Sequence, residues 1–222
     1  MPKKTKYTKS TVIEAGLDQL KEHGWEGITP KMVAKRLGSS TMPIFSHFTT
    51  MEELKSAVLD RAWEIFAEYT LKNYTGDAWV DQAIGYIFFA RDHALLFNCM
   101  HYGKPEEIQK RKFAFWELVY KELEDYHPFQ GLSSELIGWI RIIRGQLTHG
   151  IATSVSTGFA LVWTNEEVIK QMMPLCSEII CKGISGKEDE IKRVSANLTP
   201  EERAKVSRGA IDGLSNPDKR DK

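Results

Sequence analysis

The sequence predicts an all-helical (all-α) protein, and three observations lead to that fold class. Glycine and proline divide the 222 residues into pieces of helix length. Apolar residues inside these pieces recur three or four positions apart, and almost no stretch alternates apolar and polar residues as a strand would. The apolar fraction of 42% and the charged fraction of 27% are ordinary for a chain that buries a core.

Capping patterns mark where two of the helices begin. The pattern Thr-x-x-Glu, which is typical of a capping box, occurs at Thr11 and again at Thr50. The first predicts a helix over residues 11–23, which a glycine then ends. The second predicts a long amphipathic helix over residues 50–72, with its apolar side chains on one face.

Two shorter helices are expected between these. One begins at Thr29, because Pro30 suits the first helical position, and it ends at Gly38. The other fits residues 41–48, with Ser40 as its N-cap. Only a tight turn separates the two.

Further helical segments follow the long helix, and a Thr-x-x-Glu pattern at Thr164 opens the last of them. They are expected at residues 77–93, 94–102, 105–126, 133–157 and 165–183. After residue 185 the chain becomes charged, with nine basic and eight acidic residues, and Thr199 is one more expected helix start.

Several classes of protein fit the sequence poorly. The longest apolar run, residues 83–90, is far shorter than the ~20 residues of a spanning helix, and no apolar segment follows the basic N-terminus as in a secretory signal. The three cysteines are odd in number and have no C-x-x-C spacing, which argues against a disulfide framework or a zinc site. We expect a cytoplasmic protein.

Charge is unevenly distributed along a neutral chain. Basic and acidic residues number 30 each, yet residues 1–50 hold eight basic residues against four acidic ones. A basic N-terminal segment is a weak indication of nucleic-acid binding.

Residues 29–48 carry the strongest functional signal. Two short helices joined by a tight turn can place the second helix in a major groove while the first braces it. Thr41, Met42 and Ser46 would lie on the outer face of that second helix, where hydroxyls and a thioether can reach base edges. The alternative is an ordinary helical corner, which any all-α protein contains.

Several spaced elements over about residues 8–60 together resemble the N-terminal domain of TetR-family transcriptional regulators. They are Ile13-Glu-Ala-Gly-Leu17, Gly24-Trp-Glu-Gly-Ile-Thr29, Val33-Ala-Lys-Arg-Leu-Gly38, Ile44-Phe-Ser-His-Phe48 and Glu53-Leu54. The resemblance implies a homodimer in which three N-terminal helices bind double-stranded DNA at a palindromic operator. A larger helical domain would bind a small-molecule effector and dimerise. It also implies a division into residues 1–50 for DNA binding, 51–184 for ligand binding and dimerisation, and 185–222 as a charged extension.

The resemblance assigns DNA contacts to residues of the two short helices and of the next helix start. The predicted DNA-binding residues are Thr29, Lys31, Ser40, Thr41, Met42, Phe45, His47 and Thr50. Phe45 and His47 match a Tyr-x-His pair that contacts phosphates in the family, but Phe45 lacks the hydroxyl. Met51 stands where the family commonly has lysine, so two backbone contacts are in question.

The two last long segments, 133–157 and 165–183, each carry an apolar stripe. In the family such helices pair with those of a second subunit as a four-helix bundle. The predicted interface residues are Ile140, Ile143, Leu147, Ile151, Val168, Met172, Cys176 and Ile179. The alternative is that both stripes pack only within one subunit.

Aromatic residues and isolated polar ones share the helices between these segments. A polar group in an apolar helix needs a partner when it is buried, which predicts a largely apolar pocket with a few orienting polar groups. The predicted ligand-binding residues are Phe66, Phe89, Arg91, Phe97, His101, Trp116, Tyr120, Trp139, Arg144 and His149.

The sequence thus predicts a ligand-responsive, homodimeric regulator, most simply a repressor that a largely apolar or aromatic molecule releases from its operator. No metal, cofactor or catalytic motif stands out, so an enzyme is not expected. Two alternatives stay open: a helical small-molecule-binding module that has lost DNA binding, and an enzyme that uses the aromatic cavity.

Overall fold

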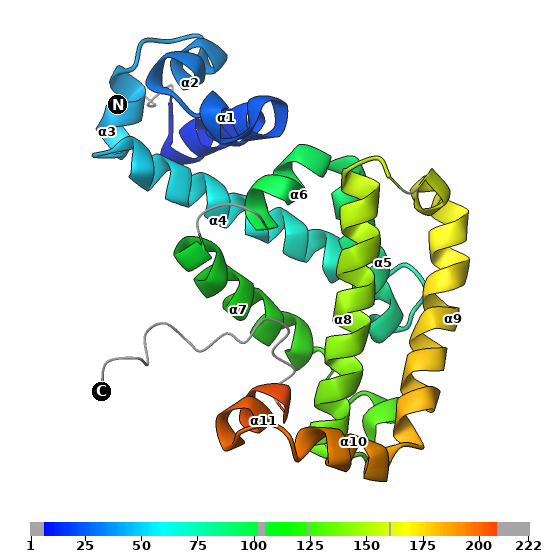
Figure 1. The fold of residues 1–222 in the computed structure, drawn as a ribbon. Coiled ribbons are helices and arrows are strands. Elements are labelled where there is room, and N and C mark those ends of the chain that lie inside the picture. Colours follow the sequence, from blue (N-terminus) through cyan, green and yellow to red (C-terminus); the bar gives the residue numbers. More distant parts are fainter. Residues whose placement is uncertain (1–6, 102–104, 124, 160, 208–222) are drawn as a thin grey trace.

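The computed structural model describes residues 7–101, 105–123, 125–159 and 161–207, and within these ranges the chain is helical and contains no strand (Figure 1). The prediction of an all-α protein is therefore confirmed. No helix among these residues has the length and apolar character needed to cross a membrane.

The N-terminal helices begin and end close to their predicted positions. They are α1 (Lys9–His23), the short 3-10 turn η1 (Gly24–Gly27), α2 (Pro30–Leu37) and α3 (Met42–His47). The start of α1 differs from the prediction, because the side chain of Thr8, not that of Thr11, caps the helix. Thr11 is the third helical residue, and its hydroxyl pairs with Thr8 in return.

Four helices follow, and Figure 1 shows the N-terminal helices gathered at one end of the first of them. They are α4 (Met51–Thr70), α5 (Ala78–Asp92), α6 (Ala94–His101) and α7 (Pro105–Lys121). The predicted seventh helix, residues 105–126, was too long, because α7 ends at Lys121. The short turn η2 (His127–Phe129) follows it.

The last part of the chain wraps around one long helix. It consists of α8 (Ser134–Ser156), η3 (Leu161–Thr164), α9 (Glu166–Ser185), α10 (Glu188–Ser195) and α11 (Pro200–Ser207). Asn165 caps α9 by accepting from the amides of Glu167 and Val168, so the prediction of Thr164 as the capping residue was wrong.

The charged extension belongs partly to the folded body. A helix was expected to start at Thr199, and Thr199 and Glu202 indeed form a capping box there. The resulting α11 packs on α8 so closely that a Cβ at Gly138 would overlap the carbonyl of Val206. Residues 208–222 lie outside the described part of the chain.

One apolar core joins the N-terminal helices to the rest of the molecule. Residues of α1, α2 and α3 share it with residues of α4 to α7, so the core crosses the predicted domain boundary at residue 50. Polar contacts cross there too. The Trp25 indole donates to Cys99 O at 3.3 Å, and Arg61 donates to a Glu14 carboxylate oxygen at 3.0 Å.

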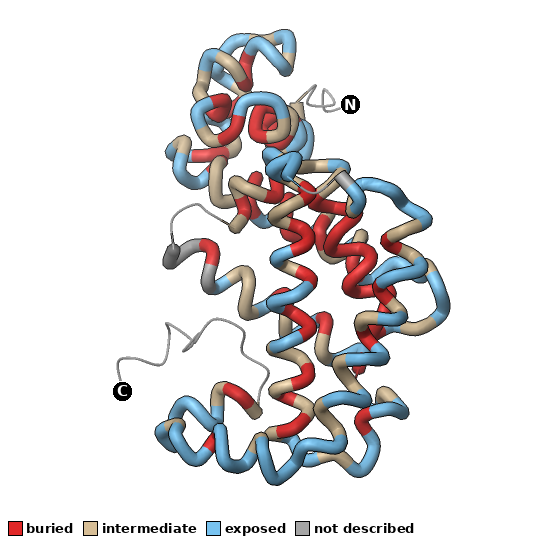
Figure 2. The backbone as a smooth tube through the Cα atoms, turned by 45° about the vertical axis from the view of Figure 1, so that its right-hand side comes forward, coloured by how far each residue is buried: buried red, intermediate tan, exposed pale blue. Residues whose placement is uncertain are grey.

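The helix α5 is the centre of the larger body. Every residue from Trp79 to Ala90 is buried, as the continuous red stretch in Figure 2 shows, because α4, α8 and α9 all pack against this helix. A helix that is apolar on all sides is stable only in such surroundings. Gly85 permits the closest of these contacts, since a Cβ there would overlap the backbone carbonyl of Tyr69 at the end of α4.

We therefore expect Gly85→Ala to lower the free energy of unfolding by about 1–3 kcal/mol, since two backbones must separate to admit the methyl group. Denaturant unfolding followed by circular dichroism measures this. Gly186→Ala is the matched control, because its Cβ would meet nothing within 4 Å and its φ of −89° suits alanine. Equal stability of the two variants would contradict the close packing of α4 on α5.

Candidate nucleic-acid interface and ligand site

The first candidate site is the pair of short helices α2 and α3. Thr29 caps α2, its hydroxyl accepting from the Met32 amide at 3.3 Å. Gly38 ends α2 in the left-handed region with a φ of 61°, which glycine adopts without strain. Residues 38–41 then turn the chain directly into α3. The prediction of Ser40 as the N-cap was wrong, because the helix begins after Thr41, whose side chain makes no capping hydrogen bond.

The helix α3 separates an apolar face from an exposed one. Ile44 and the following Phe48 are buried. On the other side Met42 is 76% exposed and Phe45 50% exposed, and the neighbouring Thr41 is exposed as well. Ser40, also exposed, accepts from the Met42 amide through its hydroxyl at 3.4 Å. The predicted base-reading side chains therefore form one exposed tip.

His47 differs from its neighbours because it is already engaged. Its Nε2 donates to the backbone carbonyl of Tyr7 at 2.9 Å, and the Tyr7 hydroxyl lies 3.5 Å from Gly38 O as a donor. Tyr7 thus joins the leading arm to the α2–α3 turn, a contact that no sequence pattern indicated. A DNA phosphate could contact His47 Nε2 only by replacing the hydrogen bond to Tyr7 O or by sharing it.

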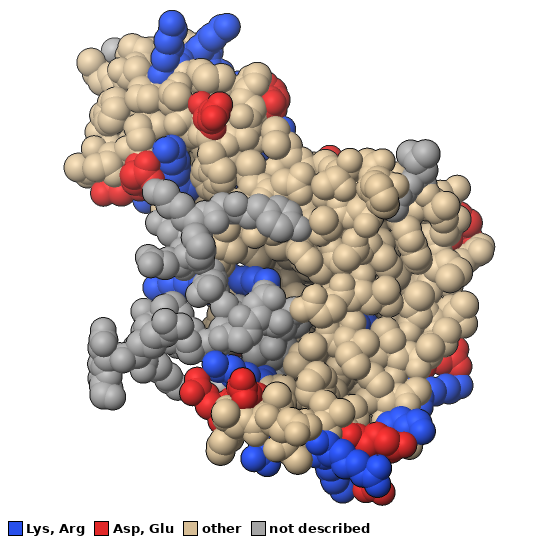
Figure 3. Space-filling view, in the orientation of Figure 1, with Lys and Arg blue, Asp and Glu red and all other residues tan. Residues whose placement is uncertain are grey.

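Basic side chains flank the exposed tip. Lys31 and Lys35 on α2 are exposed and have no carboxylate partner among the described residues, whereas Arg36 is paired with Glu22. Figure 3 shows basic side chains projecting from this end of the molecule. Lys9 lies over the ring of Phe48, 5.3 Å from its centroid. The arm residues Lys3, Lys4 and Lys6 fall outside the described ranges.

The start of α4 suits a phosphate less well than expected. The Thr50 hydroxyl accepts from the Glu53 amide at 3.2 Å, and the Glu53 carboxylate accepts from the Thr49 amide at 2.6 Å. Two amides are therefore occupied, and the carboxylates of Glu52 and Glu53 oppose an anion there. Thr50 is a helix cap in this structure.

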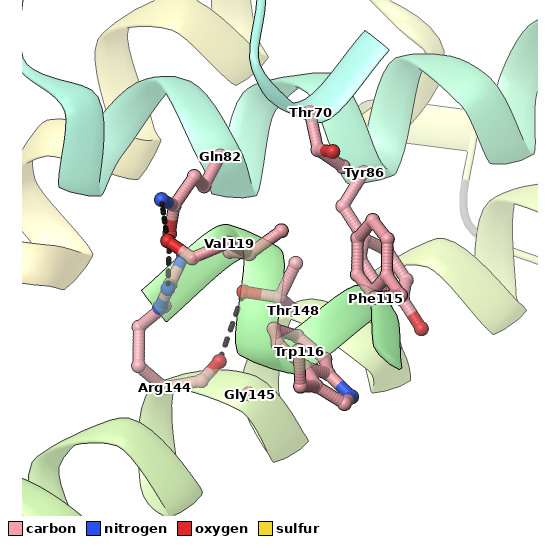
Figure 4. A pocket seen from close by; sticks show the side chains of 9 residues that line it. All are labelled: Thr70, Gln82, Tyr86, Phe115, Trp116, Val119, Arg144, Gly145 and Thr148. Carbon is pink, nitrogen blue, oxygen red and sulfur yellow. Dashed lines mark hydrogen bonds between the residues drawn. The ribbon is translucent and has the colours of Figure 1, made fainter. Parts of the chain in front are cut away.

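The second candidate site is a closed cavity of about 10 Å³ between α5, α7 and α8, room for about one water. Its lining residues are Thr70, Gln82, Tyr86, Phe115, Trp116, Val119, Arg144, Gly145 and Thr148 (Figure 4). Figure 4 shows Gln82 and Arg144 together at one end and Tyr86 beside Phe115 at the other. The cavity thus has a polar end and an aromatic end.

At the polar end Arg144 is 3% exposed. Its Nη1 donates to Trp79 O at 3.2 Å and its Nη2 to the side-chain oxygen of Gln82 at 3.3 Å, while its guanidinium lies 3.8 Å from the Trp79 ring centroid. The Gln82 amide nitrogen in turn donates to Val119 O at 2.9 Å. These bonds hold α5, α7 and α8 together around the cavity.

At the aromatic end Tyr86 connects two histidines. His101 Nδ1 lies 2.9 Å from Phe97 O, an acceptor, so this nitrogen carries the proton and Nε2 accepts from the Tyr86 hydroxyl at 3.1 Å. The hydroxyl then accepts from His149 Nδ1 at 2.9 Å. Burial lowers the pKa of His101 to about 3 and also lowers the pKa of His149, so both rings are neutral at neutral pH.

Of the predicted ligand-binding residues, Trp116 and Arg144 line the cavity, and several others lie in the aromatic cluster beside it. Phe66 and Phe97 pack on His101, and Trp116 lies against Tyr120 with ring centroids 5.4 Å apart. Phe89 lies farther along the same aromatic cluster, against Phe66.

Two predicted ligand residues lie elsewhere. Arg91 pairs with Asp92 and Glu166 at the α5–α9 contact, and the Trp139 indole donates to Ser195 on α10 at 3.1 Å. Conversely, sequence reasoning missed Gln82 and Tyr86. Their spacing of four residues inside an otherwise apolar helix was the signal that could have found them.

The predicted dimer residues divide between the surface and the interior. Ile143, Leu147, Met172 and Ile179 are exposed on α8 and α9, and Val168 and Cys176 are half-buried. Ile140 and Ile151 differ from the prediction, because they are buried within the subunit. Ile140 packs beside Trp79 and Phe129, and Ile151 lies in a separate core cluster with residues of α5 and α9.

Comparisons with models of protein families, with curated proteins and with solved structures find no match to this chain. Within the described ranges, no three His, Cys, Asp or Glu side chains come together as metal ligands would. The candidate sites therefore stand on their geometry and on the sequence patterns alone.

Stability should fall in acid because of two half-buried histidines, His101 and His149. Their folded-state pKa values lie below the ordinary value of about 6.5, so the unfolded chain binds more protons once the pH falls below 6.5. Between pH 7 and pH 5 we expect His101 alone to reduce the free energy of unfolding by about 2 kcal/mol.

Urea unfolding at both pH values measures the effect. His101→Gln keeps a donor and an acceptor but cannot titrate, so its stability should change less with pH. His127→Gln is the control, because His127 is exposed and should leave the wild-type dependence unchanged. Parallel pH profiles for wild type and His101→Gln would contradict a lowered pKa of His101 in the folded protein.

Proposed function

We propose that the protein is a homodimeric, DNA-binding transcriptional regulator, most simply a repressor, whose affinity for its operator a small molecule changes. The observation that carries the proposal is the exposed tip of α3, where Thr41, Met42 and Phe45 face solvent on a short helix that a tight turn joins to α2. Hydroxyls and a thioether suit base edges, and Lys31 and Lys35 beside them suit phosphates. The resemblance of residues 8–60 to TetR-family regulators agrees with this reading.

Two-fold symmetry would place two α3 helices in successive major grooves, roughly 34–36 Å apart. The exposed apolar faces of α8 and α9 support such a dimer, because Leu147 and Ile179 would leave water on pairing with a second copy. The helix α4 extends from the N-terminal helices to the aromatic cluster, and α6 packs against both α1 and α8. A ligand that binds one arrangement of these helices more tightly would shift the spacing of the two α3 helices.

A second candidate function is a ligand-binding module that does not bind DNA. The observations that favour it are the missing hydroxyl at Phe45, Met51 in place of a lysine, and the acidic start of α4 at Glu52 and Glu53. A gel shift with DNA from around the protein's own gene separates the two. Salt-sensitive retardation supports the regulator, and its absence at low salt supports the module.

Lys31→Ala should weaken DNA binding and reduce the slope of log affinity against log salt by about one if Lys31 contacts a phosphate. If Lys31 contacts a base instead, the preference for the operator at one position should relax. Fluorescence anisotropy over a salt series measures both quantities. Lys192→Ala on α10 is the control, because this exposed lysine is remote in sequence from α2. If Lys31→Ala has the same affinity and salt slope as the Lys192→Ala control, Lys31 does not belong to the interface.

Ile179→Glu should give a monomer, because it places a charge in the proposed apolar contact, where Ile179 is 61% exposed in the single subunit. Analytical ultracentrifugation measures the mass, and circular dichroism checks the fold. Leu118→Glu on α7 is the control, since Leu118 is 44% exposed but lies outside the α8–α9 face. A dimeric Ile179→Glu variant, or a monomeric wild type, would exclude this interface.

A further inference from the structure

Two arginines on α8, one buried and one half-buried, have no carboxylate partner in the described part of the chain. Arg144 is almost wholly buried, and its Nη1 and Nη2 donate to neutral acceptors, Trp79 O and the Gln82 amide oxygen. Arg141 is half-buried one turn earlier. Neither makes an ion pair with a carboxylate of the described residues, in contrast to Arg61, Arg91 and Arg111.

Three acidic groups act on Arg144, the phenols of Tyr120 and Tyr126 and the Cys181 thiol, and all three are neutral at physiological pH. The nearby Asp77 carboxylate accepts from the Tyr126 hydroxyl at 3.0 Å. Burial raises the pKa of Tyr120 to about 12, and burial likewise raises the pKa of the Tyr126 phenol and the Cys181 thiol. Burial lowers the pKa of Arg144 only to about 10, so its guanidinium remains charged. An interior cation without a partner is unfavourable, and proteins normally pair such a group with an anion or a metal-bound oxygen.

Hydrogen-bond donors around Tyr120 also lack acceptors. Three buried donor atoms, the Nε of Arg141, the Nε of Arg144 and the indole Nε1 of Trp116, have no hydrogen-bond acceptor among the residues that the structure describes. Tyr120 lies among them, since the Arg141 guanidinium is 4.4 Å from its ring centroid and the Trp116 ring 5.4 Å. Donors of this kind, in excess over acceptors, suit a group that brings only acceptor oxygens.

A molecule larger than a water fits beside Arg144 only if the surrounding side chains move. Trp116 and Arg144 line the cavity of about 10 Å³, and Arg141 lines a more open one of about 160 Å³ with Tyr126 and Phe129. Tyr120 contacts one residue of each lining, Trp116 and Arg141. Movement of the Tyr120 ring is therefore the change that would make room next to both arginines.

We propose that the effector is an organic carboxylate with an aromatic or aliphatic body, held by Arg144 with Arg141 beside it. This inference rests on the proposed ligand-responsive function but is independent of DNA binding. The carboxylate supplies the missing negative charge and the missing acceptors, and Gln82 holds the Arg144 guanidinium in place for it. The apolar body lies against Trp116, Phe115 and Tyr86.

The test compares acids with uncharged amides of the same shape. The probes are 4-phenylbutyrate and decanoate, each beside its primary amide, titrated into the full-length protein without DNA. Isothermal titration calorimetry gives the affinities. At least one acid should bind, and its amide should bind at least about tenfold more weakly, a difference of roughly 1.4 kcal/mol.

Arg144→Gln should remove that preference by weakening the acid at least about tenfold while leaving the amide unchanged. Arg141→Gln provides a second variant if Arg144→Gln does not fold, and it should weaken the acid in the same direction. Arg91→Gln is the control, because Arg91 is paired with Asp92 and lies outside the cavity lining.

Three results would overturn the proposal: no binding by either acid, equal affinity for acid and amide, or an unchanged preference in folded Arg144→Gln. A protein that prefers the acids but does not retard DNA would lose the regulator function and keep this site. A protein that retards DNA but shows no preference for the acids would keep the regulator function and lose this site.

Discussion

The complete burial of α5 is the constraint on which the rest of this structure depends. A helix with no solvent-facing side needs neighbours all around it, and α4, α8 and α9 supply them. Gly85 lets α4 approach to backbone contact, and Gln82 fixes the distance to α7 through Val119. The cavity lies where Gln82 and Tyr86 of α5 face α7 and α8.

The same packing connects the two candidate sites. The core that contains Phe66 near the cavity continues along α4 to Leu54 and then to Ile44 on α3. A second link runs through α6, whose Cys99 carbonyl accepts from Trp25 and whose His101 belongs to the chain of hydrogen bonds with Tyr86. Packed side chains, rather than a flexible linker, therefore connect Tyr86 and His101 to the N-terminal helices. A movement of either side chain would be transmitted through them.

Much of the fold could be predicted from local signals, because caps and stops act within one turn. The starts at Pro30, Met51 and Ser134 follow from the residue before each helix. The faces of α8 could not be predicted so well. By spacing, one apolar stripe contains Ile140, Ile143, Leu147 and Ile151. In the structure the first and last of these are buried, whereas Ile143 and Leu147 are exposed. Periodicity identifies an apolar face, whereas the neighbours that cover it depend on residues distant in sequence.

The same dependence on distant residues explains why the sequence does not predict which interior polar side chains are paired. A sequence shows that Arg141, Arg144 and His149 interrupt apolar helices, but it does not show which of them find partners. The structure distinguishes them: His149 has a neutral hydrogen-bonded partner in Tyr86, whereas the Nε of Arg144 has no acceptor among the described residues. Because an unpaired interior charge weakens folding, a natural sequence keeps one only where something else compensates for it. In this chain, that compensation is what a carboxylate ligand would provide.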